Sequence, residues 1–142
     1  MNDKYIVYFI SRTKKKIMTF IEKELQKEGL NDLIPSCGNI LTVLYENNSP
    51  LSMKEISKLI GKDKSTVTFL INKLLELEYI EKFKNDNDKR KLNIVLTNKG
   101  KKLRKKFDKI SKNVYNTAYK NFTIEEKEQF LNLLKKLNNN FS

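Results

Sequence analysis

The sequence predicts a mainly α-helical fold with one small β-hairpin, and three observations support this prediction. The 142 residues include only four glycines and two prolines, so long regular elements are favoured over loops. Hydrophobic residues make up 39% of the chain, which is enough to form a core. Apolar residues recur mostly at helical spacing, and they alternate with polar residues in one short stretch at 90–96. We therefore expect helices throughout the chain, interrupted by a single hairpin.

Amphipathic helices are expected towards both ends of the chain. Residues 5–25 carry apolar side chains at helical spacing, and Gly29 follows as the usual residue beyond a helix C-terminus. A helix capped by Thr97 continues this spacing as far as Ala118. Residues 123–126 form a capping box for a last helix. The apolar residues expected on that helix are Phe130, Leu131, Leu133, Leu134, Leu137 and Phe141.

A helix-turn-helix is expected in the centre of the chain. Ser52 and Glu55 have the spacing of a capping box, which begins a short helix. Gly61 opens a three-residue turn, and Asp63 is a suitable N-cap for a second helix over residues 64–77. The residues expected to face inward are Ile56, Leu59 and Ile60 in the first helix and Val67, Leu70, Ile71, Leu74 and Leu75 in the second.

One helix and one hairpin flank this motif. The helix opens at Pro35-Ser36 and ends at the turn-forming residues 46–50. Residues 79–84 and 90–96 predict two strands, which are joined by a turn over 85–89. A hairpin directly after the second helix of a helix-turn-helix is a wing. The predicted fold class is therefore a winged helix-turn-helix lobe with further helices before and after it.

Positive charge is concentrated in the middle of the chain. The 29 Lys and Arg residues outnumber the 17 Asp and Glu residues, which gives a net charge of +12. Residues 47–112 carry 18 basic and eight acidic side chains, whereas the segments on either side have a net charge of only +1 each. A solvated Lys-rich surface is one interpretation. Because the charge coincides with the helix-turn-helix, we favour the other interpretation, which is binding to a polyanion.

The composition excludes several classes of function. The chain has no histidine, the commonest catalytic base and zinc ligand, and its four glycines are isolated, so no phosphate-binding loop is formed. We expect neither an enzyme nor a metal or cofactor site. One cysteine cannot close an intrachain disulfide, and no apolar run is long enough to span a bilayer. A cytoplasmic protein without a signal peptide or membrane segment is therefore expected.

Four short motifs then come in a characteristic order. They are Ser-Thr-Val-Thr at 65–68, Asn-Lys-Leu at 72–74, Asp-Lys-Arg at 88–90 and Leu-Thr-Asn-Lys-Gly at 96–100. Together they resemble the MarR family of winged helix-turn-helix transcriptional regulators. The resemblance implies an obligate homodimer that binds double-stranded DNA. It also implies a single domain over 1–142, with a DNA-binding lobe at 34–98 and a helical dimerisation region at 1–33 and 99–142.

The candidate DNA-binding residues lie mainly on the second helix of the motif. With its apolar residues turned inward, this helix presents hydroxyl, amide and ammonium groups that can contact base edges and phosphates. This outward face consists of Lys64, Ser65, Thr66, Thr68, Phe69, Asn72 and Lys73. Ser52 and Lys54 begin the preceding helix and are expected to contact the DNA backbone through free amides and charge.

The wing supplies the remaining candidates. The family order assigns Arg90 to the DNA minor groove, with Asp88 orienting it; a simple surface ion pair is the alternative. Lys89 and Lys91 are expected to contact phosphates. Phe69 departs from the polar residue that many relatives carry, and it has two interpretations: it packs on a thymine methyl group, or it leans on the wing.

Other features keep more than one interpretation. A basic run can extend the DNA footprint or form solvated helix surface, and we favour the latter for its distal half. The run consists of Lys99, Lys101, Lys102, Arg104, Lys105, Lys106, Lys109 and Lys112. Cys37 lies at an expected helix N-terminus, where the helix dipole favours a thiolate and hence a redox switch. We favour a buried, small hydrophobic role for Cys37.

The sequence thus predicts a dimeric repressor that binds an AT-rich inverted repeat. A nonspecific, nucleoid-associated nucleic-acid-binding protein is the alternative, and the uncharged hydroxyl and amide groups of the recognition helix favour base reading instead. A winged helix that only mediates protein–protein contact is disfavoured by the basic centre. The family resemblance also implies release from DNA by a small ligand, for which the sequence indicates no site.

Overall fold

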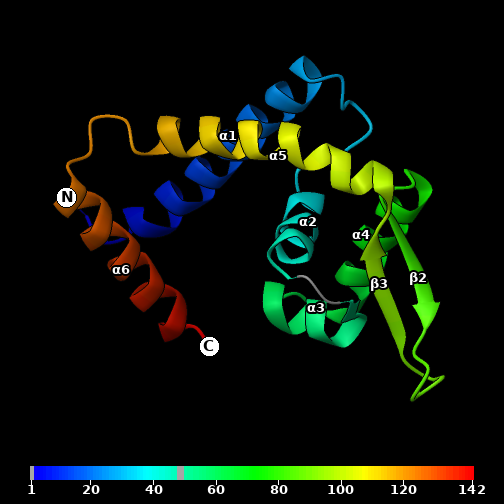
Figure 1. Cartoon of the computed structure of the whole chain (residues 1–142). Helices are drawn as coiled ribbons and strands as arrows, with labels where there is room; N and C mark the ends of the chain where they lie inside the picture. The colour runs from blue at the N-terminus through cyan, green and yellow to red at the C-terminus, as the bar shows by residue number, and fades with distance from the viewer. Residues whose placement is uncertain (1, 48–49) are drawn as a thin grey trace. The chain divides into compact units, whose positions relative to one another are not determined.

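The computed structural model describes residues 2–47 and 50–142, and it confirms the predicted fold class. The chain forms two compact units, residues 1–110 and residues 111–142, with helices and a small sheet (Figure 1). The elements are α1 (Tyr5–Lys27), α2 (Cys37–Glu46), β1 (Leu51–Ser52), α3 (Met53–Ile60), α4 (Lys64–Glu76), β2 (Ile80–Lys84), β3 (Leu92–Leu96), α5 (Asn98–Ala118) and α6 (Ile124–Asn140). The turn expected at 46–50 includes Asn48 and Ser49, which lie outside the described residues.

The sheet is antiparallel and has the strand order β1-β3-β2. The hairpin pairs Ile80 with Leu96 at its base and Lys84 with Leu92 towards its tip. The sequence did not predict β1, which pairs Leu51 with Ile94 over only two residues. Alternation of polar and apolar residues cannot be recognised over so short a strand.

The core of the first unit lies where α2, α3, α4 and the sheet meet. Its most deeply buried side chains are Cys37, Ile40, Leu41, Ile56, Val67, Leu70, Ile71, Leu74 and Ile94. One predicted inward residue is wrong: Leu59 is 55% exposed. Successive helical residues are about 100° apart, so Leu59 lies about 60° from the buried Ile56, at the margin of a helix that is only eight residues long.

Helix α5 is attached to this core at its start. Tyr45 Oη donates a hydrogen bond to the Gly100 carbonyl over 2.7 Å, and the Tyr45 ring lies 5.2 Å from the ring of Phe107. The Cβ of Gly38 in α2 would likewise meet the ring of Phe107 at 3.9 Å. Burial raises the pKa of Tyr45, so its hydroxyl stays protonated and available as a donor.

The N-terminal half of α1 is not covered within the described chain. Tyr5, Ile6, Val7, Tyr8, Phe9 and Ile10 are each about half exposed or more. The C-terminal part differs, because Leu25 is buried and Leu30 N–H donates to the Leu25 carbonyl as the helix ends. Gly29 there has a φ of 73°, as the predicted helix stop requires.

The second unit contains the end of α5 and all of α6. The predicted capping box is present: Thr123 Oγ1 accepts from Glu126 N–H and the Glu126 carboxylate accepts from Thr123 N–H, both at 3.0 Å. The Phe122 ring lies 5.7 Å from Tyr119 and 5.9 Å from Phe130. Along α6, Phe130, Leu131, Leu133 and Leu134 remain exposed.

Candidate nucleic-acid interface

The turn between α3 and α4 is fixed by two caps and one glycine. Ser52 Oγ accepts from Glu55 N–H at 3.1 Å, and the Glu55 carboxylate accepts from Ser52 N–H at 3.2 Å. Gly61 ends α3 with a φ of 65°, which glycine adopts without strain. Asp63 Oδ1 accepts from Thr66 N–H at 3.1 Å and begins α4. The helix-turn-helix therefore forms as the local sequence predicts.

Helix α4 has one buried and one exposed side. Val67, Leu70, Ile71 and Leu74 are in the core. The predicted outward residues are all at least partly accessible: Lys64, Ser65, Phe69 and Asn72 are exposed, and Thr66, Thr68 and Lys73 are half-buried. The predicted outward face is therefore present, while its contact with DNA stays a prediction.

Two hydroxyl groups near the start of α4 donate to the protein itself. Ser65 Oγ donates to Asp63 Oδ2 over 3.1 Å, and Thr68 Oγ1 donates to the Lys64 carbonyl over 2.8 Å. Because a hydroxyl has one proton and two lone pairs, both groups present acceptor sites to an incoming ligand. Hydrogen bonds from Thr66 and Ser65 also keep the pKa of Asp63 below its usual value.

Phe69 is the apolar residue in the middle of the exposed face. Its side chain is 54% exposed, and Lys73 Nζ lies 5.8 Å from its ring centroid. Lys73 also lies 4.0 Å from the Glu76 carboxylate. Contact of Phe69 with a thymine methyl group and contact with the wing both stay predictions.

The tip of the β2–β3 hairpin holds Arg90 in a defined position. Asp88 Oδ1 accepts from the Arg90 backbone N–H at 3.0 Å and from Arg90 Nε at 3.2 Å. These two bonds lower the pKa of Asp88, which stays ionised. The Arg90 side chain is 92% exposed, so the outer edge of its guanidinium faces solvent. Lys89 and Lys91 are exposed on either side of it.

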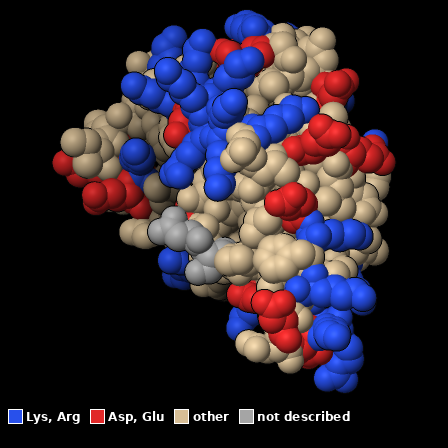
Figure 2. All heavy atoms as spheres, turned by 45° about the vertical axis from the view of Figure 1, so that its right-hand side comes forward, with Lys and Arg blue, Asp and Glu red and all other residues tan. Residues whose placement is uncertain are grey.

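The turn of the wing is further ordered by Asn85. Asn85 Oδ1 accepts from Asn87 N–H at 2.8 Å, and Asn85 N–H donates to the Lys91 carbonyl over 3.0 Å. Figure 2 shows Lys and Arg side chains gathered in groups on this face, with one group at the lower end of the view. Figure 1 places the hairpin at the same end of the molecule. A cationic tip on an ordered hairpin is suited to a narrow, negative groove.

The MarR family model matches residues 37–92, which include α2 to the start of β3. Over 110 residues the chain is 31% identical to the HTH-type transcriptional regulator SarZ of Staphylococcus aureus, covering 75% of this chain and 72% of SarZ. The chain belongs to the MarR family. It is also 29% identical over 131 residues to the HTH-type transcriptional regulator BilQ of Clostridium symbiosum, covering 92% of this chain and 88% of BilQ.

A solved structure of a MepR–DNA complex of S. aureus has the same fold. Its TM-score is 0.86 at 22% sequence identity, and the match covers 99% of this chain and 100% of MepR. The relatives of this MarR-family chain are named as transcriptional regulators, so the expectation that it is not an enzyme is confirmed.

One detail of the predicted interface is wrong. The amide of Ser52 is not free for a phosphate, because it donates to Glu55 within the capping box. The sequence identified this box, and the reciprocal bond of the box uses the same amide. Ser52 is half-buried and Lys54 is exposed, so a contact through the Ser52 hydroxyl and the Lys54 ammonium stays a prediction.

The basic run on α5 is also more engaged than predicted. In its distal half, Lys109 Nζ lies 2.7 Å from the Glu28 carboxylate and Lys106 Nζ donates to the Glu28 carbonyl over 3.0 Å. Near its start, Lys99 Nζ donates to the Leu77 carbonyl over 2.7 Å. These three lysines therefore join α5 to other elements of the first unit, and they are not simply solvated. Helical spacing alone does not reveal such long-range partners.

Cys37 is a core residue of this MarR-family chain. Its side chain is 1% exposed at the start of α2, and burial raises the pKa of its thiol to about 11. The favoured hydrophobic role is confirmed. The expectation that the helix N-terminus favours a thiolate is wrong, because desolvation opposes the charged form more strongly.

No metal site or membrane span is found in the described part of the chain. Among residues 2–47 and 50–142, no group of three or more His, Cys, Asp or Glu side chains could hold a metal ion. The helices of these residues are too short or too polar to cross a bilayer.

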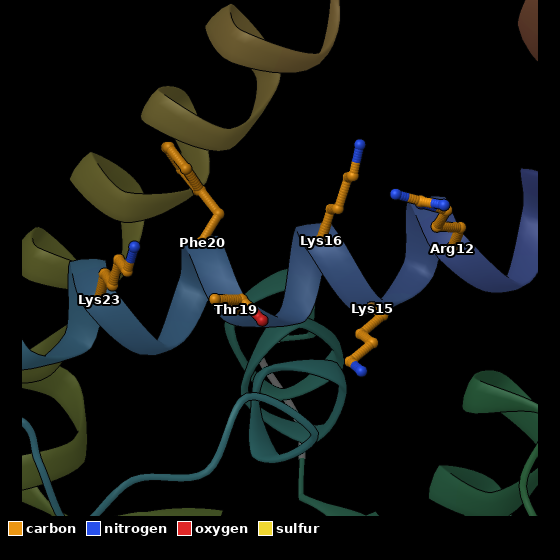
Figure 3. Close-up of a pocket in the computed structure, with 6 residues that line it drawn as sticks. All are labelled: Arg12, Lys15, Lys16, Thr19, Phe20 and Lys23. Atoms are coloured by element: carbon orange, nitrogen blue, oxygen red, sulfur yellow. The ribbon is translucent and has the colours of Figure 1, made fainter.

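A cationic pocket of about 660 Å³ lies along α1 (Figure 3). Arg12, Lys16 and Phe20 point to one side of the helix in this view. The pocket is also lined by Lys15, Thr19 and Lys23. Within the described residues, none of the four cations forms an ion pair. Since all lining residues come from one helix, another element is needed to enclose a ligand.

Proposed function

We propose that the chain is a sequence-specific regulator of transcription that binds double-stranded DNA through residues 34–98. The observation that carries this proposal is the exposed polar side of α4 next to a hairpin with Arg90 at its tip. In this arrangement, the N-terminal residues of α4 enter the major groove and Arg90 enters the adjacent minor groove. MepR, which has the same fold, is a DNA-bound example.

The chemistry of α4 favours base reading over bulk phosphate binding. The acceptor sites of Ser65 and Thr68 suit the amino groups of cytosine and adenine, and the Asn72 amide suits adenine. The accessible cations of α3, α4 and the wing are suited to phosphates; they are Lys54, Lys64, Lys73, Lys89 and Lys91. A nonspecific nucleic-acid-binding protein needs the cations but gains nothing from ordered hydroxyl groups.

The active form in this proposal is a homodimer. Two sets of apolar residues are exposed in one chain: residues 5–10 on α1, and Phe130, Leu131, Leu133 and Leu134 on α6. A helix end that is apolar on all sides is unfavourable in water, and a second copy would cover it. Two lobes held about one helical turn of DNA apart would bind an inverted repeat, and the Arg90 contact favours AT-rich sequence.

As a repressor, this cytoplasmic dimer would leave DNA when a small ligand binds. The pocket along α1 is the best candidate for such a ligand, which would be an anion with an apolar part. A second copy could supply the enclosing element that one helix lacks. Benzoate is a suitable first probe: it should lower DNA affinity in the wild type and act less on Lys16→Met.

Fluorescence anisotropy across a range of salt concentrations tests the proposed function. The two probes are a duplex from the region upstream of the coding sequence and a shuffled duplex of equal composition. Selective binding at about 150 mM salt, with a salt slope that corresponds to several released counterions, supports a sequence-specific regulator. If both duplexes bind equally, a random-sequence selection follows, and failure to enrich any sequence would establish the nonspecific alternative.

The same assay separates base contacts from phosphate contacts. We expect Ser65→Ala and Thr66→Ala to alter base preference more than the salt slope. A reporter gene behind the selected sequence tests the sign of regulation. Its expression should fall when the protein is present, and a rise would make the protein an activator.

A further inference from the structure

The end of the recognition helix α4 has an unusual backbone. The amide of Tyr79 donates to the Leu74 carbonyl over 3.1 Å and that of Glu78 donates to the Leu75 carbonyl over 3.0 Å. This is a Schellman motif, in which the residue with positive φ is usually glycine. Here that residue is Glu78, with a φ of 63°. A left-handed conformation at a residue with a Cβ is unfavourable and needs support from its surroundings.

The first turn of α5 supplies this support. Three successive carbonyls accept hydrogen bonds from it: Leu77 from Lys99 Nζ at 2.7 Å, Glu78 from Thr97 Oγ1 at 2.6 Å, and Tyr79 from Thr97 N–H at 3.1 Å. Lys99 Nζ also lies 4.6 Å from the centroid of the Tyr79 ring. We call Thr97, Lys99 and Gly100 the α5 clamp.

Gly100 completes the clamp by its lack of a side chain. A Cβ at this position would lie 2.1 Å from the Tyr79 carbonyl oxygen, a distance that requires the backbone to move. Thr97 Oγ1 accepts from the Gly100 N–H at 3.0 Å while it donates to Glu78. The Thr97 hydroxyl therefore caps α5 and holds the end of α4 at the same time.

The clamp lies where the recognition helix and the wing are both attached. α4 ends at Glu76, β2 begins at Ile80, and β3 ends at Leu96, the residue before the clamp. Ile80 and Leu96 are paired in the sheet. The clamp therefore fixes both the end of the recognition helix and the base of the wing on the first turn of α5.

We propose that Thr97, Lys99 and Gly100 are positioning residues for DNA recognition, which act through α4 and the wing without touching DNA. This inference rests on the proposed function. α4 has 13 residues and is about 20 Å long, so a tilt of about 5° at its end moves its first residues by about 1.7 Å. Base-reading groups tolerate a displacement of only about 0.5 Å.

The proposal also gives Lys99 a different role from its neighbours in the basic run. Its ammonium group lies against the C-terminal carbonyls of α4, where the helix dipole favours a cation. Lys102, three residues further along α5, is exposed and carries the same charge. If both lysines only contacted phosphates, removing either charge would change DNA affinity and its salt dependence in the same way. The clamp instead predicts that removing the charge of Lys99, but not that of Lys102, reduces sequence selectivity.

The test compares Lys99→Met and Thr97→Val with two controls, Lys102→Met and Thr97→Ser. Binding to the selected duplex and to its shuffled counterpart is measured by anisotropy across salt concentrations, below the melting temperature of every variant. We expect Lys99→Met and Thr97→Val to reduce the affinity ratio between the two duplexes about tenfold, with the salt slope of the wild type. Lys102→Met should keep the ratio within about twofold, and Thr97→Ser, which retains the hydroxyl, should restore it.

Other outcomes overturn the proposal. A Lys99→Met protein that loses affinity for both duplexes equally, with a salt slope reduced by about one, would make Lys99 a phosphate contact. Variants with lower melting temperatures but an unchanged affinity ratio would make the clamp purely structural. If Thr97→Val does not fold, the exposed Lys99 still provides the test through Lys99→Met. A wild type without selectivity would refute the proposed function instead, so the two failures can be distinguished.

Discussion

The winged lobe and the helical ends differ in what covers their apolar side chains. In the lobe, Ile40, Ile56 and Leu74 are 0% exposed. In α1 and α6, Val7 is 72% exposed and Leu133 is 63% exposed. Both regions have the same helical spacing of apolar residues in the sequence. The comparison teaches that this spacing predicts which side of a helix must be covered, but not which chain supplies the cover.

The largest expected effect is on the lobe core. Leu74→Ala should lower the free energy of unfolding by about 2–5 kcal/mol, because it leaves a cavity between α4 and its neighbours. Urea unfolding followed by circular dichroism measures this change. The matched control is Leu59→Ala, whose side chain is 55% exposed and should change stability by no more than about 0.5 kcal/mol. Equal losses would show that Leu59 is also covered in solution.

The next prediction concerns the dimer interface that is proposed to bury the exposed apolar residues of α1 and α6. Ile6→Glu and Leu134→Glu place a charge on faces that the proposed dimer buries, and each should weaken self-association at least about a hundredfold. Light scattering should then give a mass near 16.8 kDa, while the wild type gives about twice that value.

The control for self-association is again a substitution of Leu59, which lies in the winged lobe. Leu59→Glu introduces the same charge at an exposed leucine and should leave the dimer mass unchanged. Circular dichroism should show a folded protein in all three variants. A persistent dimer in both Ile6→Glu and Leu134→Glu would mean that other surfaces hold the two copies together.

A smaller effect is expected from the wing, where a substitution should weaken DNA binding without dissociating the dimer. Arg90→Ala should weaken specific DNA binding by about 1–3 kcal/mol in the anisotropy assay, with an unchanged mass by light scattering. Arg90→Lys keeps the charge but loses the planar guanidinium that Asp88 orients, so it should recover only part of the affinity. Unchanged affinity in Arg90→Ala would remove the wing from the interface.

Much of the lobe could be predicted from the sequence because its signals are local. The capping box of Ser52 and Glu55, the left-handed Gly61 and the Asp63 cap each act within four residues, and all are present. The polar side of α4 likewise follows from the burial of Val67 and Leu70 on the other side. Local chemistry and helical period determine these features together.

The features that the sequence did not reveal depend on contacts between distant residues. Lys99 reaches the Leu77 carbonyl across 22 positions, and Lys106 reaches the Glu28 carbonyl across 78 positions. Both lysines belong to a charged run in which every member has the same local pattern. Cys37 is a similar case, since its raised pKa results from burial by the fold and opposes the local effect of the helix N-terminus.

The smallest expected effect is within the helical region, where the end of α1 contacts α5 in the first unit. The hydrogen bond from Lys109 lowers the pKa of Glu28, and the same contact raises the pKa of Lys109. A carboxyl group with a lowered folded pKa stabilises the fold above its unfolded pKa, and this stabilisation is lost as the pH falls through the folded value. For the raised pKa of Lys109, the stabilisation is present below the unfolded value and is lost at alkaline pH.

Glu28→Gln should therefore be less stable than the wild type between about pH 6 and 9, and the difference should disappear as the pH falls through the lowered folded pKa of Glu28. Thermal unfolding of both proteins at a fixed protein concentration, repeated across this pH range, measures the difference in stability. The effect is small because the Lys109 side chain is 65% exposed and water screens the pair. Glu81→Gln, an exposed carboxylate on the wing, is the matched control and should show no such dependence. A difference between Glu28→Gln and the wild type that persists below the lowered folded pKa of Glu28 would assign the effect to packing, since the carboxyl is neutral there.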